Sequence, residues 1–167
     1  LNAVEYGPDS FQEAIKRRHP ALYGKRDRIK ARWAPAVSVL LLDESKTRMR
    51  HGAAPSLPAA YVQQIDGIVI GPRVGSCGTA AYTAKPVIVS DIANDPLWDD
   101  FRSIAAPFGL RACWSHPILG AAGQVLGSFA VYKSAPALPT ESEWELLVDA
   151  SHITALIIER SRADQAR

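Results

Sequence analysis

Long apolar stretches and cysteines are both scarce in this sequence. No run approaches the roughly 18 uncharged apolar residues that span a bilayer, so we expect no membrane insertion. The first residues lack a basic segment followed by an apolar run, so we expect no secretory signal and a cytoplasmic location. The two cysteines, Cys77 and Cys113, allow at most one disulfide, and in a reducing compartment both are expected to be free thiols.

Several motifs of metal, nucleotide and nucleophile chemistry are also absent. The four histidines show no metal-ligand spacing, and two cysteines alone do not complete a zinc site. The glycine-rich segment 71–78 has neither the Gly-Lys-Ser/Thr ending of a phosphate-binding loop nor the glycine spacing of a dinucleotide fingerprint. No nucleophile elbow surrounds Ser76. We therefore identify no cofactor and expect a protein that is not an enzyme.

The composition is that of a globular protein of one domain. Apolar residues make up 47% and charged residues 22% of the 167 positions, which disfavours disorder. Charge is uneven, because residues 1–32 hold eight basic and four acidic side chains whereas the rest of the chain is slightly acidic. A charge run of this kind is most often a solvated helix face, so we expect no nucleic-acid partner.

Apolar periodicity and turn residues predict an α+β fold. Thr140 and Glu143 have the spacing of a capping box and predict the start of the longest helix. The predicted elements are a helical arm in 1–33, strands at 37–42 and 48–52, a short helix capped by Ser56, an extended run at 68–70, a strand at 87–89, a helix capped by Asp95, a hairpin of 111–119 with 125–132, and a helix over 141–163. We expect a mostly antiparallel sheet with helices on its faces, divided into an arm (1–33), a core (34–139) and a C-terminal helix (140–167) of a single domain.

The glycine-rich segment and the strand near Cys113 contain the most informative candidate positions. Glycines before a helical turn let backbone N–H groups approach a ligand, or they form a tight turn only. Cys77 at the start of that turn is either a thiol with a lowered pKa or a buried inert residue. Alternation in the strand places Arg111, Cys113 and Ser115 on one side and Ala112, Trp114 and His116 on the other, without showing which side lines a cavity.

The predicted C-terminal helix has two adjacent apolar stripes. One contains Trp144, Leu147, Val148, Ala155 and Ile158, and the other contains Leu146, Ala150, Ile153 and Ile157. A helix with that much apolar surface needs both a sheet and a second partner, either the N-terminal arm or another subunit. The stripe of Leu22, Ile29 and Trp33 in the arm suits such a partner helix.

Five segments, in this order, resemble the GAF domain family. They are residues 75–82 (GSCGTAAY), 87–92 (VIVSDI), 95–98 (DPLW), 109–115 (GLRACWS) and 127–130 (GSFA), within a resemblance that covers about residues 34–160. The similarity is greatest to GAF domains of multidomain bacterial signalling proteins, beside histidine kinases and cyclic-di-GMP synthases or hydrolases.

The resemblance implies a sensor of a small molecule. In this family the terminal helices lie on one face of the sheet and often dimerise, and the ligand pocket lies on the other face. It implies an unidentified small-molecule ligand, a homodimer through the terminal helices, and an output domain of two-component or cyclic-di-GMP signalling. The implied ligand-binding residues are Arg73, Ser76, Cys77, Thr79, Tyr82, Asp91, Trp98, Arg111, Cys113 and Ser115.

Two alternatives to ligand sensing stay open. Free methionine-(R)-sulfoxide reductases are GAF proteins, and Cys77 matches the cysteine of their Gly-Val-Cys-Gly-Thr-Ala motif. The catalytic cysteine of these reductases is expected near Ile104, where this chain has no cysteine. The first alternative is therefore a thiol redox sensor that uses Cys77 with Cys113, and a reductase of this type is the less favoured form of it. The other alternative is a dimerisation module without a ligand.

Overall fold

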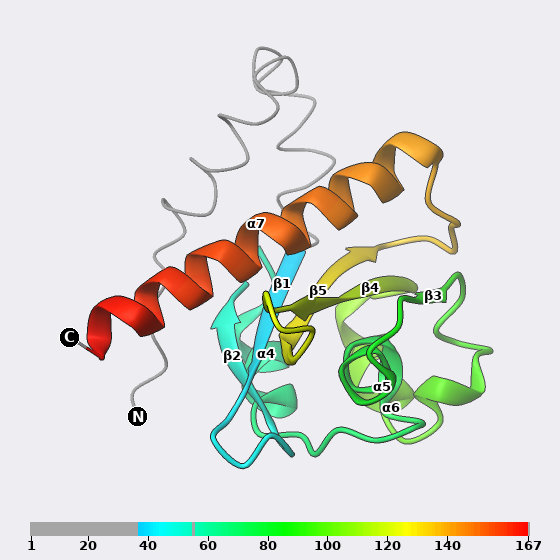
Figure 1. Cartoon of the computed structure of the whole chain (residues 1–167). Coiled ribbons are helices and arrows are strands. Elements are labelled where there is room, and N and C mark those ends of the chain that lie inside the picture. Colours follow the sequence, from blue (N-terminus) through cyan, green and yellow to red (C-terminus); the bar gives the residue numbers. More distant parts are fainter. Residues whose placement is uncertain (1–36, 55, 167) are drawn as a thin grey trace.

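The computed structural model describes residues 37–54 and 56–166, which form a five-stranded sheet between two layers of helices (Figure 1). The strand order is β2-β1-β5-β4-β3, and every neighbouring pair is antiparallel. The strands are β1 (Val37–Leu42), β2 (Met49–Ala53), β3 (Val87–Val89), β4 (Ala112–Leu119) and β5 (Val125–Lys133). The predicted α+β class is confirmed, whereas the predicted helical arm lies outside the described residues.

The β4–β5 hairpin forms the centre of the sheet. Its turn is closed by a backbone hydrogen bond from Gly120 N to Gln124 O of 2.8 Å, and Gly123 has a φ of +81° that favours glycine. Most side chains of β4 and β5 are buried because helices cover both faces of the hairpin. Successive residues of these strands therefore contact different helical layers.

The long helix α7 (Glu141–Gln165) crosses one face of the sheet (Figure 1). The predicted capping box is present, since Glu143 N donates to Thr140 Oγ1 over 3.1 Å and Thr140 N donates to Glu143 Oε1 over 3.2 Å. Leu147, Ala155 and Ile158 of the first predicted stripe are buried. The buried row also includes two small polar residues, Ser151 and Thr154, which sequence periodicity alone had not indicated.

The opposite face of the sheet carries short helices. They are α4 (Ala59–Ile65), α5 (Gly75–Thr83), α6 (Arg102–Ala105) and the 3₁₀ turns η1 (Pro96–Trp98) and η2 (Ala106–Phe108). The segment predicted as one helix after Asp95 is thus three short pieces. Residues 99–101 form a turn after η1, and Pro107 lacks the N–H that would continue the α-helical ladder beyond α6. Asp95 caps as predicted, accepting from Leu97 N over 2.9 Å.

Three local predictions are wrong in detail. Helix α5 begins at Gly75, so the second half of the glycine-rich segment is its first turn rather than a loop. Helix α4 has Pro58 at its N-cap with no side-chain capping bond, so Ser56 does not cap it, and the predicted core residue Ala60 is exposed. The predicted extended run 68–70, by contrast, is present and pairs through an isolated antiparallel bridge between Val69 and Arg48.

Within the described residues, no helix combines the length and apolar character needed to cross a membrane. The same residues include no group of three or more His, Cys, Asp or Glu side chains placed to hold a metal ion.

Candidate functional site

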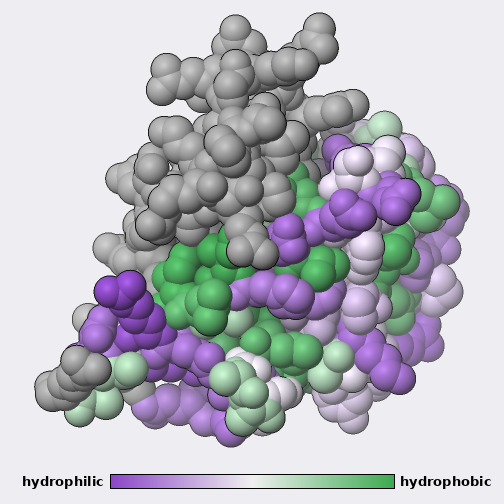
Figure 2. Space-filling model, turned by 45° about the horizontal axis from the view of Figure 1, so that its top comes forward, coloured by the Kyte–Doolittle hydropathy of each residue, from purple (hydrophilic) through white to green (hydrophobic). Residues whose placement is uncertain are grey.

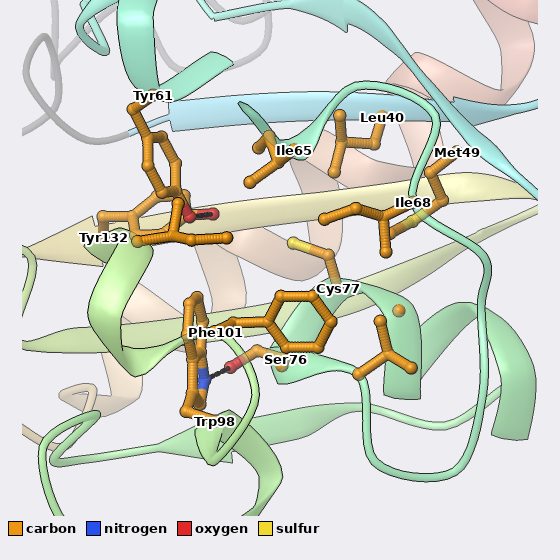
Figure 3. Close-up of a pocket in the computed structure, with 14 residues that line it drawn as sticks. Leu40, Met49, Tyr61, Ile65, Ile68, Ser76, Cys77, Trp98, Phe101 and Tyr132 are labelled. Carbon is orange, nitrogen blue, oxygen red and sulfur yellow. Dashed lines mark hydrogen bonds between the residues drawn. The ribbon is translucent and has the colours of Figure 1, made fainter. Parts of the chain in front are cut away.

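A small cavity of about 30 Å³ lies between the sheet and the layer of short helices (Figure 3). Its wall is formed by β1, β2 and β5 on one side, and by α4, α5, η1 and the segment that follows η1 on the other. The lining residues are Leu40, Met49, Tyr61, Ile65, Ile68, Val74, Gly75, Ser76, Cys77, Gly78, Trp98, Phe101, Ile104 and Tyr132. No side chain in this lining carries a charge, so the cavity is apolar apart from a few hydroxyl, thiol and indole groups.

Ser76 fixes the start of α5 against both the sheet and η1. Its hydroxyl donates to the backbone oxygen of Cys113 over 2.9 Å and accepts from Trp98 Nε1 over 3.1 Å. Ser76 is fully buried and Trp98 nearly so, so both partners of the indole–hydroxyl bond are shielded from water. The bond therefore holds the Trp98 ring at the edge of the cavity (Figure 3).

The tight packing of α5 depends on glycine at position 78. A Cβ atom there would lie 2.5 Å from Val74 Cγ1, which is closer than packed side chains tolerate. Glycine thus allows the loop before α5 to fold against the helix and places Val74 in the cavity wall.

Two tyrosines meet above the sheet at the other end of the cavity. The hydroxyls of Tyr61 and Tyr132 are 2.8 Å apart, and their rings pack edge to face. Burial raises the pKa of both phenols well above the ordinary value, so both stay protonated and act as neutral hydrogen-bonding groups. Trp98 packs edge to face against Tyr132 and completes this aromatic wall.

The two cysteines lie together beneath the cavity, and both are free. The Cys77 sulfur is 3.2 Å from Ser115 Oγ, and the Cys113 sulfur is 3.8 Å from the same oxygen. Hydrogen bonding from the Cys113 thiol lowers the pKa of Cys77, whereas burial raises the pKa of Cys113 well above its ordinary value. Of the two sulfurs, only that of Cys77 lines the cavity.

Of the ten candidate binding residues, the structure places three in the cavity wall, namely Ser76, Cys77 and Trp98. Cys113 and Ser115 lie directly behind them in β4 and contact α5. Thr79 is structural in its contacts, since its Oγ1 donates to Gly75 O over 2.6 Å and accepts from Val74 N over 3.1 Å.

The other four candidates do not line this cavity. Tyr82 is 57% exposed on α5. Asp91 pairs with Arg111 over 3.4 Å, and a hydrogen bond from Asn94 lowers the pKa of the Asp91 carboxyl. Asp91 and Arg111, which were predicted to bind the ligand together with Cys77, thus lie outside this cavity wall: Arg111 precedes the first residue of β4, and its guanidinium pairs with Asp91.

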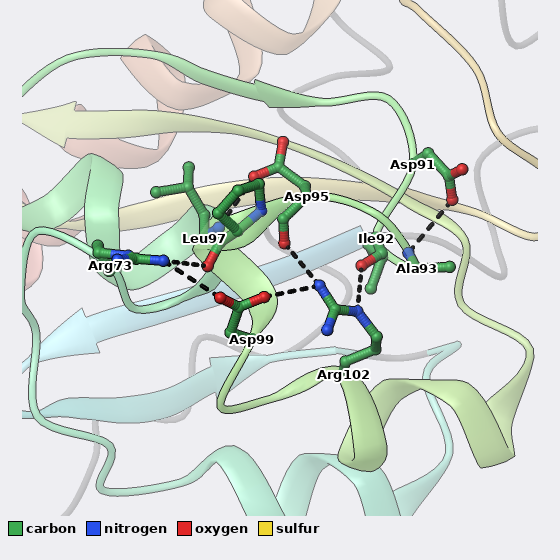
Figure 4. A network of polar contacts seen from close by, with 9 residues as sticks. Arg73, Asp91, Ile92, Ala93, Asp95, Leu97, Asp99 and Arg102 are labelled. Atoms are coloured by element: carbon green, nitrogen blue, oxygen red, sulfur yellow. Dashed lines mark hydrogen bonds and ion pairs between the residues drawn. The ribbon is translucent and has the colours of Figure 1, made fainter.

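Arg73 belongs to a surface network that ties the loop before α5 to η1 (Figure 4). Its guanidinium is 3.2 Å from the Asp99 carboxylate and donates to Pro96 O over 3.3 Å. Asp99 also pairs with Arg102 over 2.9 Å, and Arg102 donates to the backbone oxygens of Ile92 and Asp95. These contacts hold the segment that carries Trp98 and Phe101 over the cavity.

The sequence did not indicate that the hydroxyl groups of Tyr61 and Tyr132 belong to the site. Tyr61 was assigned only to a helix core face, and Tyr132 only to a strand. A tyrosine within a strand as apolar as β5 is a usable signal, because a buried phenol needs a polar partner. Nothing in the sequence identified Tyr61 as that partner, since the two residues are 71 positions apart.

Known proteins with this fold include sensors and reductases. A sensor histidine kinase domain from Sinorhizobium meliloti 1021 aligns with a TM-score of 0.69 and 23% identity over 100% of this chain and 99% of that chain. A free methionine-R-sulfoxide reductase from Neisseria meningitidis, solved with its substrate, aligns with a TM-score of 0.65 and 20% identity over 92% of this chain and 91% of that chain. At these identities the likeness shows the fold alone.

Sequence comparison identifies the family. The methyl sulfide methyltransferase-associated sensor of Methanosarcina acetivorans is 40% identical over 129 residues, which are 77% of this chain and 13% of that protein. The chain thus spans only a small part of the length of this relative. The family model of the GAF domain matches residues 27–159. The chain belongs to the GAF domain family.

Proposed function

We propose that this domain is a sensory module that binds a small molecule in the cavity and passes the signal through α7. The observation that carries the proposal is the position of the cavity and α7 on opposite faces of one sheet, with β5 contacting both. The 40% identical sensor from Methanosarcina acetivorans supports a sensory role. An output domain of two-component or cyclic-di-GMP signalling and a cytoplasmic location are parts of the same proposal.

Strand β4 supplies a direct route between the two faces. Cys113 and Ser115 contact the start of α5, whereas His116 Nδ1 lies 2.9 Å from Ser151 Oγ of α7. Trp114 Nε1 donates to Ala137 O, in the segment that leads into α7, over 2.9 Å. A ligand that shifts α5 against β4 therefore alters the contacts of α7, provided that it binds the two arrangements with different affinity.

A homodimer through the terminal helices is part of the proposal. Leu156 on α7 is 68% exposed, and Leu146, Ile153 and Ile157 are half-buried. Figure 2, turned so that the α7 side comes forward, shows hydrophobic side chains exposed among polar ones on this side. A second subunit would cover such residues, and light scattering over a range of concentrations tests for it: a monomer at every concentration contradicts the dimer.

Amide chemical shifts test signal transmission. Compounds that raise the melting temperature would be titrated into ¹⁵N-labelled protein, and shifts are expected both around Ser76 and Cys77 and along α7 near Ser151. Ser151→Ala is the matched variant, because it removes the bond to His116 without touching the cavity wall. It should still bind the compound but show smaller shifts in α7. Shifts confined to the cavity, or the absence of any stabilising compound, would contradict the sensory proposal.

Thiol redox sensing is a second candidate, favoured by the adjacent Cys77 and Cys113. A peroxide would join the two sulfurs, taking one hydrogen from each thiol while it is itself reduced to water or an alcohol and water. Reduction of free methionine sulfoxide is less well supported, because that zwitterion would find no charged partner in the cavity wall.

Mass spectrometry after peroxide treatment tests the redox candidate. The expected product has lost two hydrogens and contains a peptide that links Cys77 to Cys113. Cys113→Ser should instead retain an unlinked, oxidised Cys77. Recovery of two unmodified thiols after peroxide treatment of the native protein would exclude redox sensing.

A further inference from the structure

We propose that the cavity selects a small uncharged molecule that has one hydrogen-bond acceptor and is otherwise apolar. This inference rests on the proposed sensory function and names the class of ligand for the same cavity. It follows from three properties of the wall: its charge, its volume and its unfilled hydrogen-bonding capacity.

The charge of the wall excludes ionic ligands. None of the lining side chains is Asp, Glu, Lys, Arg or His. The nearby ions Arg73 and Arg102 both pair with Asp99 (Figure 4), and none of the three belongs to the cavity lining. Moving a carboxylate, phosphate or ammonium group into such a site removes its hydration without supplying a counter-ion, which is strongly unfavourable. Nucleotides and amino acids are therefore poor ligands for this conformation.

The volume limits the size of the ligand. A water molecule needs roughly 10–15 Å³ measured in this way, so a cavity of about 30 Å³ has room for about two waters. Covalently bonded atoms lie closer together than separate waters do, so the liquid volume of two waters, roughly 60 Å³, accommodates a molecule of roughly three or four non-hydrogen atoms. A purine or a tetrapyrrole would need the helical layer to move away from the sheet.

The tyrosine pair provides one hydrogen-bond donor with capacity to spare. Two phenols carry two O–H hydrogens, and their mutual bond uses one of them. The Cys77 thiol lines the same cavity, but sulfur is a weak acceptor for the second hydrogen. A ligand oxygen would be a better acceptor for this hydrogen.

The other donors of the wall are already satisfied. Trp98 Nε1 donates to Ser76 Oγ, and Ser76 donates to the backbone of Cys113. The remaining wall, which includes Leu40, Ile65 and Phe101, is apolar. A ligand with a second polar group would leave that group buried without a partner, which costs affinity. One acceptor and an apolar remainder is thus the arrangement that fits.

Three isosteric probes test this selectivity: acetone, which is neutral with an acceptor; acetate, which is charged; and 2-methylpropene, which has no oxygen. Each would be titrated into the ¹⁵N-labelled domain while the amide shifts of Gly75, Ser76, Cys77 and Tyr132 are followed. Because a ligand with about four non-hydrogen atoms binds no more tightly than roughly tens of micromolar, the titration must extend into the millimolar range. We expect saturable shifts with acetone, at least about tenfold weaker binding of 2-methylpropene, and none with acetate.

Phenylalanine variants test the role of the tyrosine hydroxyls. Either Tyr61→Phe or Tyr132→Phe leaves one free phenol donor, so each should keep the preference for acetone over 2-methylpropene. The double variant should bind both probes equally, and its amide spectrum must otherwise match that of the wild type. If the double variant does not fold, loss of the preference in both single variants would still overturn the inference.

The outcomes separate the ligand class from the sensory function. Binding of acetate as tightly as acetone overturns the proposed class but leaves a sensor. If acetone does not bind but a larger or charged compound stabilises the domain, the proposed ligand class is again wrong and the sensory function again stands. If no compound binds at all, both the ligand class and the sensory function fail.

Discussion

Replacing Ser76 with alanine tests whether the bond between α5, β4 and η1 organises the candidate site. The substitution removes one buried oxygen that accepts from Trp98 Nε1 and donates to Cys113 O. Serine and alanine differ little in size, so the backbone of α5 should stay in place. The effect on stability then comes mainly from the hydrogen-bonding groups that lose their partner.

The magnitude follows from burial. Trp98 is only 4% exposed, so its indole N–H would be left without a partner and out of contact with water. An unsatisfied buried donor costs about 1–3 kcal/mol, whereas the Cys113 carbonyl lies in β4, which pairs with strands on both sides, and it keeps a second lone pair. We therefore expect Ser76→Ala to lower the free energy of unfolding by about 1–3 kcal/mol.

Urea unfolding of a double-mutant cycle with Trp98→Phe measures this effect. In the Trp98→Phe background no indole N–H is left unpaired, so Ser76→Ala should cost less there, with a coupling energy of at least about 1 kcal/mol. Ser38→Ala is the matched control, since Ser38 Oγ is also buried but has no hydrogen-bond partner among the described residues. The reasoning would be refuted if the losses in unfolding free energy from Ser76→Ala and Trp98→Phe were additive. It would also be refuted if Ser38→Ala lowered the unfolding free energy as much as Ser76→Ala does.

Three further predictions concern the supporting structure. Burial lowers the pKa of His116 in the folded protein, so the unfolded chain takes up a proton at this residue first as the pH falls. The free energy of unfolding should therefore be constant above the unfolded pKa of about 6.5 and decrease as the pH falls through the folded pKa. Urea unfolding at several pH values should show this decrease in the wild type and a smaller one in His116→Gln. Gly78→Ala should lower the free energy of unfolding by about 1–3 kcal/mol because its Cβ would meet Val74, and an unchanged urea midpoint would contradict this packing. Thr140→Ala should cost about 1 kcal/mol by removing the N-cap of α7, whereas Thr140→Ser should restore most of it.

Local features of the fold were predictable because they depend on neighbouring residues. The Thr140–Glu143 capping box, the Asp95 cap and the hairpin around Gly123 each involve residues within a few positions of one another. Their chemistry appears directly in the order of the amino acids. The departures were also local, as at α5, where the first helical turn includes glycines that sequence reasoning assigned to a loop.

The site was predictable only in part. Ser76 and Cys77 of segment 75–82 and Trp98 of the DPLW segment lie in the cavity wall, and their role in ligand binding stays a prediction. Alternation along β4 separated Cys113 and Ser115 from Trp114 and His116, but the packing of α5 and α7 was needed to show which pair lies toward the cavity. Asp91 and Arg111 pair with each other outside the cavity wall, which their positions in the sequence did not indicate.

The sequence by itself determined the class of fold, the family resemblance and the strands and caps that short-range chemistry specifies. Only the tertiary structure decided that Tyr61 and Tyr132 meet, that the cavity is small, and that its wall is uncharged. The physical reason is that a cavity is the space left after distant segments have packed together. Its volume and polarity depend on how side chains from many elements meet, which the order of residues along the chain does not reveal.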